Sequence, residues 1–259
     1  MASSLPRSLR LDPKKLLETS ARLERRIEER FEGSGLRRVC EELVRCSSNA
    51  AWVCVSIRRP NVWLRATSGV SITMILIVVL GAAWVAMEGA ASEADPSDWR
   101  DIPTVGEAIV NEVLLLGAAI WFFVTLERNQ KRERVITALA DLRTLAHLID
   151  IHQLSKNPDT LGQPLENTPS SPERHLDGVS MGRYLDYCSE MLSLTGKVAA
   201  LYGEAFSDAA AVEAVNDVEE LCIGLQRKIW QKIIILEHRM QHRSPVLRST
   251  LLERVPEEE

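Results

Sequence analysis

Two long apolar stretches, residues 66–87 and 108–126, constrain the fold of this chain more than any other feature. Neither stretch contains Lys, Arg or Pro. As α-helices they would extend about 33 and 28 Å at ~1.5 Å per residue, which matches the ~30 Å thickness of bilayer hydrocarbon. The sequence therefore predicts an all-α integral membrane protein with two transmembrane helices and a cytoplasmic helical bundle.

The charges that flank the two stretches predict the orientation of the chain. The loop of residues 88–107 carries six acidic residues and one basic residue, Arg100. The outer flanks of both stretches are basic, with Arg58, Arg59, Arg65, Arg128, Lys131, Arg132 and Arg134. Because Lys and Arg concentrate on the cytoplasmic side of membrane proteins, we expect both termini to be cytoplasmic.

Changes in composition divide the chain into eight segments. Residues 127–154 contain no Gly or Pro and keep a helical period, so the second span should continue as one helix into the cytoplasm, whereas residues 155–180 are rich in Pro, Ser, Asn and Thr. The predicted segments are N-terminal amphipathic helices (1–60), transmembrane helix 1 (61–90), an acidic external loop (91–106), transmembrane helix 2 (107–127), its cytoplasmic extension (128–154), a flexible linker (155–180), a helical hairpin (181–243) and a tail (244–259).

Apolar residues at helical spacing predict which faces are buried. Asp12 and Pro13 predict the start of the opening helix, and its buried face is predicted to be Leu16, Ser20, Leu23 and Ile27. In the extension of the second span they are Val135, Ala138, Leu139, Leu142, Leu145, Ala146 and Ile149. In the last long helix they are Val215, Val218, Cys222, Leu225, Ile229, Ile233, Leu236 and Met240.

The last helix also carries a second apolar stripe, formed by Ile223, Trp230 and Ile234. One antiparallel neighbour covers one stripe, so two stripes indicate two neighbours. We therefore expect this stripe to be an oligomer interface and the protein to be a homo-oligomer.

Asn111 and Glu112 are polar residues inside the second apolar stretch. An ionised carboxylate that faces lipid is expensive, so Glu112 either extends to the interface, packs between helices or lies at the mouth of a pore. In the last case small ions would be partners of the protein.

One edge of the helical extension is polar, with Arg143, His147 and Asp150 at spacings of four and three and His152 two residues further on. These residues are candidates for a polar network or a ligand site. His152 lies about 140° around the helix from His147 at 100° per residue, and no second helix offers matching ligands, so no metal site is predicted.

The net charge, the cysteines and the absence of motifs limit the classes of function that the sequence predicts. The net charge is -5, and no basic face with interleaved aromatic residues occurs away from the membrane flanks, so nucleic acid is not an expected partner. The five cysteines lie on the predicted cytoplasmic side, where thiols stay reduced. No catalytic or cofactor motif occurs, and we expect no cofactor, with membrane lipid and further copies of the chain as partners.

The strings HLIDIHQLSK, RYLDYCSEMLSLTGKVAALY and IWQKIIIL resemble parts of an uncharacterised bacterial family of two-span membrane proteins, from the second span to residue 236. The resemblance implies the bacterial inner membrane as location and brings no activity with it. Two functions follow as expectations. The first is a non-enzymatic homo-oligomer, as a small channel or a membrane-anchored regulator. The alternative is a membrane-anchored metal-dependent or hydrolytic enzyme that uses the edge of Arg143, His147 and Asp150.

Overall fold

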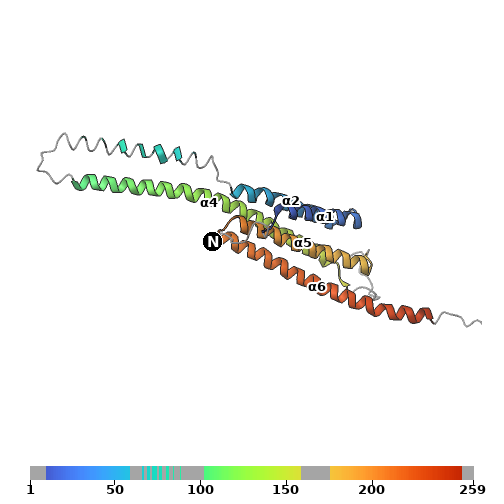
Figure 1. Ribbon diagram of the computed structural model, residues 1–259. Coiled ribbons are helices and arrows are strands. Elements are labelled where there is room, and N and C mark those ends of the chain that lie inside the picture. The colour runs from blue at the N-terminus through green and yellow to red at the C-terminus, as the bar shows by residue number, and fades with distance from the viewer. Residues whose placement is uncertain are drawn as a thin grey trace, which may run out of the picture. The chain divides into compact units, whose positions relative to one another are not determined.

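The computed structural model describes residues 10–58, scattered positions between 66 and 88, residues 102–158 and residues 176–252. All regular structure in these residues is helical, with no strand among them, so the all-α prediction is confirmed. The bounded helices, shown in Figure 1, are α1 (Pro13–Arg30), α2 (Gly35–Arg58), α4 (Ile102–Leu154), α5 (Gly178–Ala205) and α6 (Ala209–Leu252).

The chain divides into two compact units. One unit consists of Met1–Ser56 and Val135–Glu259, and the other of Ile57–Arg134. In the second unit α4 is helical from Ile102 onward, and it continues without a break to Leu154. Within the part of the chain that the structure describes, no helix combines the length and the hydropathy of a membrane span.

Local signals set the ends of α1 as the sequence predicts. The Asp12 carboxylate accepts a hydrogen bond from the Lys14 backbone N–H (3.0 Å), and Pro13 occupies the first helical position. After the helix ends, Gly33 adopts a φ of 68°, a conformation that favours glycine. The predicted stripe of Leu16, Ser20, Leu23 and Ile27 is buried.

Helices α2 and α4 run antiparallel in the first unit. Gly35, at the start of α2, lies against the imidazole of His152 near the end of α4. Eleven residues further along α2, Cys46 is an electrostatic neighbour of Asp141, which lies eleven residues back along α4. This equal spacing fixes the register of the two helices over that length.

Helix α5 is the central element of the first unit, because each of the other helices contacts it. Its Glu190 pairs with Arg26 of α1, and its Leu201 carbonyl accepts a hydrogen bond from the Cys54 thiol of α2 (3.5 Å). Tyr184 donates to the His152 carbonyl of α4 (3.4 Å), and the Ser189 carbonyl accepts from Gln226 of α6 (3.0 Å). A helix with neighbours on all sides should be apolar around its circumference. The buried residues of α5 are Met181, Tyr184, Leu185, Tyr187, Cys188, Met191, Leu192, Leu194, Thr195, Val198, Ala199, Leu201 and Tyr202.

A stripe of small residues on α5 packs against α6. The stripe is Gly182, Ser189, Gly196 and Gly203, at successive intervals of seven residues, and Val215, Cys222, Ile229 and Leu236 recur at the same interval on α6. A Cβ atom added to Gly196 would lie 3.9 Å from the Cys222 Cβ, and one added to Gly203 would lie 3.6 Å from Val215. Because a seven-residue repeat keeps two helices in contact over many turns, this antiparallel pair forms a continuous seam.

The predicted core faces of the longer helices are confirmed with one correction. Every residue predicted for the face of the α4 extension is buried, as is the α6 series from Val215 to Leu236. Met240, predicted as the last member of that series, is 39% exposed. It lies against Gly178 at the first position of α5, where the seam ends and no longer covers it.

Candidate functional site

A polar cluster closes the C-terminal end of α4. The buried Gln153 donates from its side-chain amide to the Asp150 carboxylate (2.5 Å). The Gln153 backbone carbonyl accepts hydrogen bonds from the Lys232 ammonium of α6 (2.8 Å) and from the Lys156 backbone N–H (3.1 Å). The last carbonyls of a helix lack intrahelical partners and carry partial negative charge, so a cation here satisfies and stabilises the helix end.

Burial lowers the pKa of two basic groups in this cluster, His152 and Lys232. The pKa of His152 is lowered, mainly because burial disfavours the imidazolium and further because Arg38 and Lys156 are close by. The pKa of Lys232 is also lowered by burial, while the nearby Asp150 acts in the opposite direction. Lys156 lies over the Tyr184 ring at 5.3 Å. The cluster thus joins α4 to α5 and α6, and the Lys232 ammonium provides a hydrogen-bond donor for the end of α4.

The residues of the polar edge proposed from the sequence differ in burial and do not form one site. Arg143 and His147 are exposed, while Asp150 and His152 are half-buried. No hydrogen bond or ion pair joins the described side chains of Arg143, His147 and Asp150 to one another. Among the described residues, no group of three or more His, Cys, Asp or Glu side chains has a geometry that could hold a metal ion.

Sequence reasoning missed Lys232, Gln153 and Tyr184 as members of the cluster. Lys232 and Tyr184 have their acceptors on α4, 79 and 32 residues away in sequence. The period within one helix carries no information on such contacts. The available signal was a basic residue on a half-buried edge of α6, a position that needs an acceptor on a neighbouring element.

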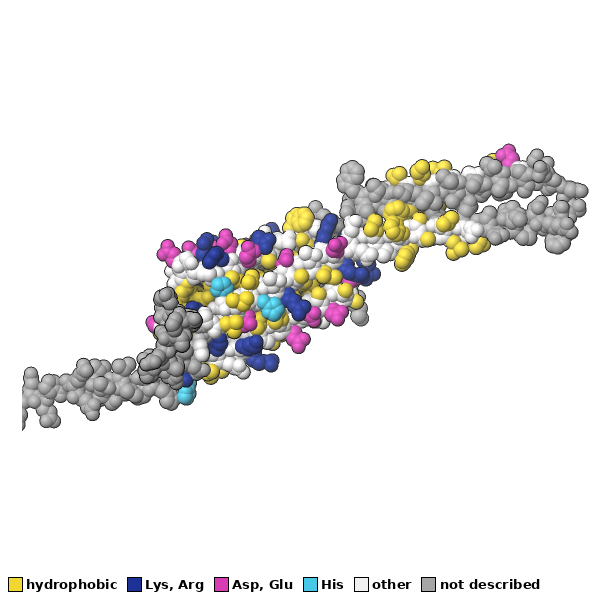
Figure 2. All heavy atoms as spheres, turned by 180° about the vertical axis from the view of Figure 1, so that it is seen from behind, with side chains coloured by type: hydrophobic (Ala, Val, Ile, Leu, Met, Phe, Trp, Pro, Cys, Tyr) yellow, Lys and Arg dark blue, Asp and Glu magenta, His cyan; other side chains and the backbone are white. Residues whose placement is uncertain are grey.

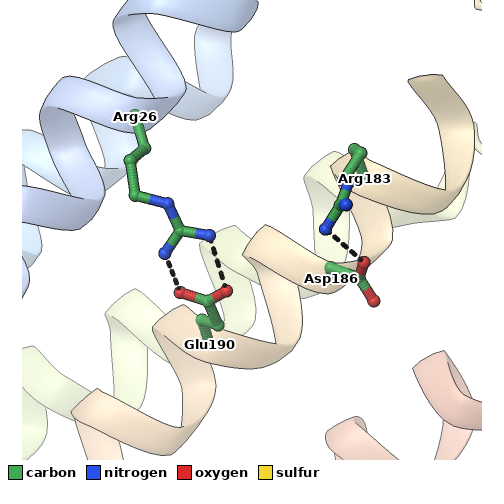
Figure 3. A network of polar contacts seen from close by, with 4 residues as sticks. All are labelled: Arg26, Arg183, Asp186 and Glu190. Carbon is green, nitrogen blue, oxygen red and sulfur yellow. Dashed lines mark hydrogen bonds and ion pairs between the residues drawn. The ribbon is translucent and has the colours of Figure 1, made fainter.

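A second polar network joins α1 to α5 (Figure 3). The Arg26 guanidinium binds both carboxylate oxygens of Glu190, at 2.7 and 3.2 Å, and lies 5.0 Å from the centre of the Tyr187 ring. The hydrogen bond to Glu190 is the main cause of a raised pKa at Arg26. Arg183 and Asp186, also in Figure 3, form a longer pair at 3.8 Å along α5. Because both Arg26 and Glu190 are 43% exposed, we assign the pair a positioning role and only a small part of the stability.

None of the five cysteines forms a disulfide bond, and four of them are buried. Burial raises the pKa of Cys40 and of Cys188 to about 12, and that of Cys222 to about 11. A thiol acts as a nucleophile or a metal ligand through its thiolate, which these values disfavour. Cys40, Cys188 and Cys222 therefore serve as small apolar core residues.

The outer face of α6 carries the predicted interface residues, and they are exposed in the protomer. Ile223, Trp230 and Ile234 are 56%, 58% and 59% exposed. On the face seen in Figure 2, charged side chains gather on the unit that contains α6, whereas hydrophobic side chains gather on the surface of the unit of Ile57–Arg134. Large apolar residues thus lie on the surface of both units.

Asn111 and Glu112, the candidate residues of the second apolar stretch, lie on α4. Asn111 is exposed. Glu112 belongs to the helix, and its side chain lies outside the described residues.

Comparisons of the chain with protein-family models, with curated proteins and with solved structures gave no match.

Proposed function

We propose that this chain is a membrane-anchored, non-enzymatic protein that assembles with copies of itself. Its two apolar stretches cross the bacterial inner membrane, and both termini lie in the cytoplasm. The assembly acts as a small cation channel or as a membrane-anchored regulator.

The observation that carries the proposal is the exposure of large apolar side chains around α4. Val110, Leu114, Leu115, Ile120, Trp121 and Phe122 are each between 41% and 70% exposed. At 100° per residue these positions are spread around most of the helix circumference. Water disfavours such a surface, at roughly 25 cal/mol per Å² of apolar area, whereas lipid chains accept it.

The exposed side chains of the first apolar stretch also favour a lipid environment. Val70, Met74, Ile77, Leu80 and Trp84 are each at least 60% exposed. The basic flanks and the acidic loop between the stretches support the orientation with both termini inside.

The polar groups of the first unit support a non-enzymatic role. Lys232, Gln153 and Asp150 close a helix end, and Arg26 with Glu190 joins two helices. These contacts give Lys232, the Gln153 amide nitrogen, Arg26 and Glu190 structural partners at the helix junctions.

Carbonate extraction of membranes tests the anchoring. The full-length protein should stay in the membrane pellet at high pH, and a cysteine introduced at Ser97 should react with an impermeant reagent added to intact cells. Release of the protein into the carbonate supernatant would contradict anchoring. Labelling of Ser97→Cys only after lysis would contradict the orientation.

Conductance in planar bilayers separates the channel from the regulator. In the channel version, Glu112 side chains of several copies attract cations near the pore mouth, so Glu112→Gln should lower cation conductance and leave the assembly intact. Glu133→Gln is the matched control, because it removes an acid from the same helix outside the apolar stretch. A parent protein without conductance would exclude the channel and leave the regulator.

A further inference from the structure

We propose that the outer face of α6, formed by Glu220, Ile223, Gly224, Arg227, Trp230 and Ile234, docks onto the same face of a second copy, with the two α6 helices antiparallel and crossing near Gly224. The inference rests on the self-association in the proposed function and adds the surface, the orientation and the charge pairs.

The apolar part of this face is exposed in the described protomer. Ile223, Trp230 and Ile234 are all more than half exposed, and Val212 at the start of the helix is 42% exposed. Their spacings of eleven, seven and four residues place them in one row along α6. Trp is among the residues most enriched at the energetic centres of protein interfaces.

Gly224 lies midway along this face in the direction of the helix axis, and at its edge around the circumference, about 100° from Ile223. No described atom of another element lies within 4 Å of the position that its Cβ would take. A glycine inside a helix destabilises it relative to alanine, and the seam with α5 does not use this one. A residue without a side chain lets a second backbone approach closely, so Gly224 suits the crossing point of two helices.

The charges along α6 are complementary to those of a reversed copy. From Ala209 to Gln226 the helix carries acidic residues and no Lys or Arg; the acids are Glu213, Asp217, Glu219 and Glu220. From Arg227 onward the first charged side chains are the exposed Arg227 and Lys228, whereas Lys232 is bound to the Gln153 carbonyl of its own protomer. An antiparallel pair places each acidic half against a basic half, whereas a parallel pair places like charges together.

Two residues make this complementarity specific. Glu220 lies four residues before Gly224 and Arg227 three residues after it, about 6 and 4.5 Å along the helix axis at 1.5 Å per residue. In the antiparallel pair, Glu220 of one copy therefore faces Arg227 of the other, and the two-fold symmetry produces this contact twice. Both residues are exposed, and neither forms an ion pair with another described residue of its own protomer.

Charge reversal in the full-length protein tests the pairing. In detergent, sedimentation should show that Glu220→Arg alone and Arg227→Glu alone lose the α6 contact, because each places two like-charged pairs across it. Mixing the two variants in equal amounts should restore the parent mass, because both contacts of the mixed pair are then opposite in charge. Single variants that keep the parent mass, or a mixture that stays dissociated, would overturn the proposal. Circular dichroism of each variant verifies that the helices remain folded.

Disulfide formation tests the orientation independently. A copy with Glu213→Cys should cross-link to a copy with Ile234→Cys on brief oxidation, since these positions lie eleven and ten residues on opposite sides of Gly224. Ile234→Cys alone should form no cross-linked dimer. Dimers of Ile234→Cys alone would establish a parallel arrangement and overturn the inference. Membrane anchoring is measured by carbonate extraction, so a failure of either proposal is distinguishable from a failure of the other.

Discussion

Both faces of α6 carry an apolar stripe, and they differ in what lies against them. On the inner face Cys222, Ile229 and Leu236 are each less than 5% exposed, whereas Ile223 and Trp230 on the outer face are more than half exposed. The glycines of α5 account for the difference, because they let α5 approach the inner face along its length. The burial of an apolar stripe therefore depends on its neighbour, and we propose that the outer stripe of α6 has its neighbour in a second copy of the chain.

Matched alanine substitutions should separate the two faces most strongly. Ile229 is fully buried, so Ile229→Ala should lower the free energy of unfolding by roughly 2–5 kcal/mol. Ile234 lies five residues further along and is 59% exposed, so Ile234→Ala should lower the free energy of unfolding of the protomer by less than about 1 kcal/mol and weaken association instead. Thermal unfolding in detergent under dissociating conditions measures the free energy of unfolding of both variants. Equal losses for the two variants would mean that the faces do not differ as described.

Changes at the glycine seam should have the next largest effect. Gly196→Leu adds a side chain where the Cβ alone already lies 3.9 Å from Cys222, and overpacking of this kind costs about 1–3 kcal/mol. Gly196→Ala should be neutral or stabilise by up to about 1 kcal/mol, because the methyl group fits and alanine favours the helix. Denaturant unfolding of the two variants gives the comparison. A stable Gly196→Leu protein would show that α5 and α6 are not closely packed.

The smallest expected effect concerns pH and the polar cluster at the end of α4. The pKa of His152 in the folded protein is below its ordinary value of 6.5, so the unfolded chain binds the proton more readily. The contribution of His152 to stability is therefore complete above pH 6.5 and is lost as the pH falls below that value. Compared with the parent, His152→Gln should lose less stability between pH 8 and pH 5 in denaturant titrations, and His147→Gln, at an exposed position, is the control. Identical losses in the parent and in His152→Gln would contradict the assigned burial.

The helical fold could be predicted from the sequence because it depends on local signals. These signals act within single helices. The structure shows the cap of Asp12 and Pro13, the unbroken helix over residues 127–154 that contains no Gly or Pro, and the buried periodic stripes. The exposure of Ile223, Trp230 and Ile234 followed from the same periodicity. The role of this stripe as an interface remains a prediction.

The contacts between helices could not be predicted in the same way. The seam of Gly182, Gly196 and Gly203 consists of residues that a search for apolar stripes ignores, although their seven-residue interval is visible in the sequence. The candidate polar network or ligand site of Arg143, His147, Asp150 and His152 rests on neighbouring positions of a single helix. Instead, Lys232 meets the Gln153 carbonyl at the end of α4, because α6 carries the lysine there from 79 residues away.

The most direct test of the difference between the two faces is the mass of a Trp230→Glu variant. Sedimentation of the full-length protein in detergent should show that this variant falls to a smaller assembly than the parent, because a charge in the paired face would be buried without a partner. Its helical circular dichroism and its unfolding temperature should match those of the dissociated parent, since Trp230 is 58% exposed in the protomer. An unchanged mass with native helicity would show that the outer face of α6 is not an interface and would contradict the account.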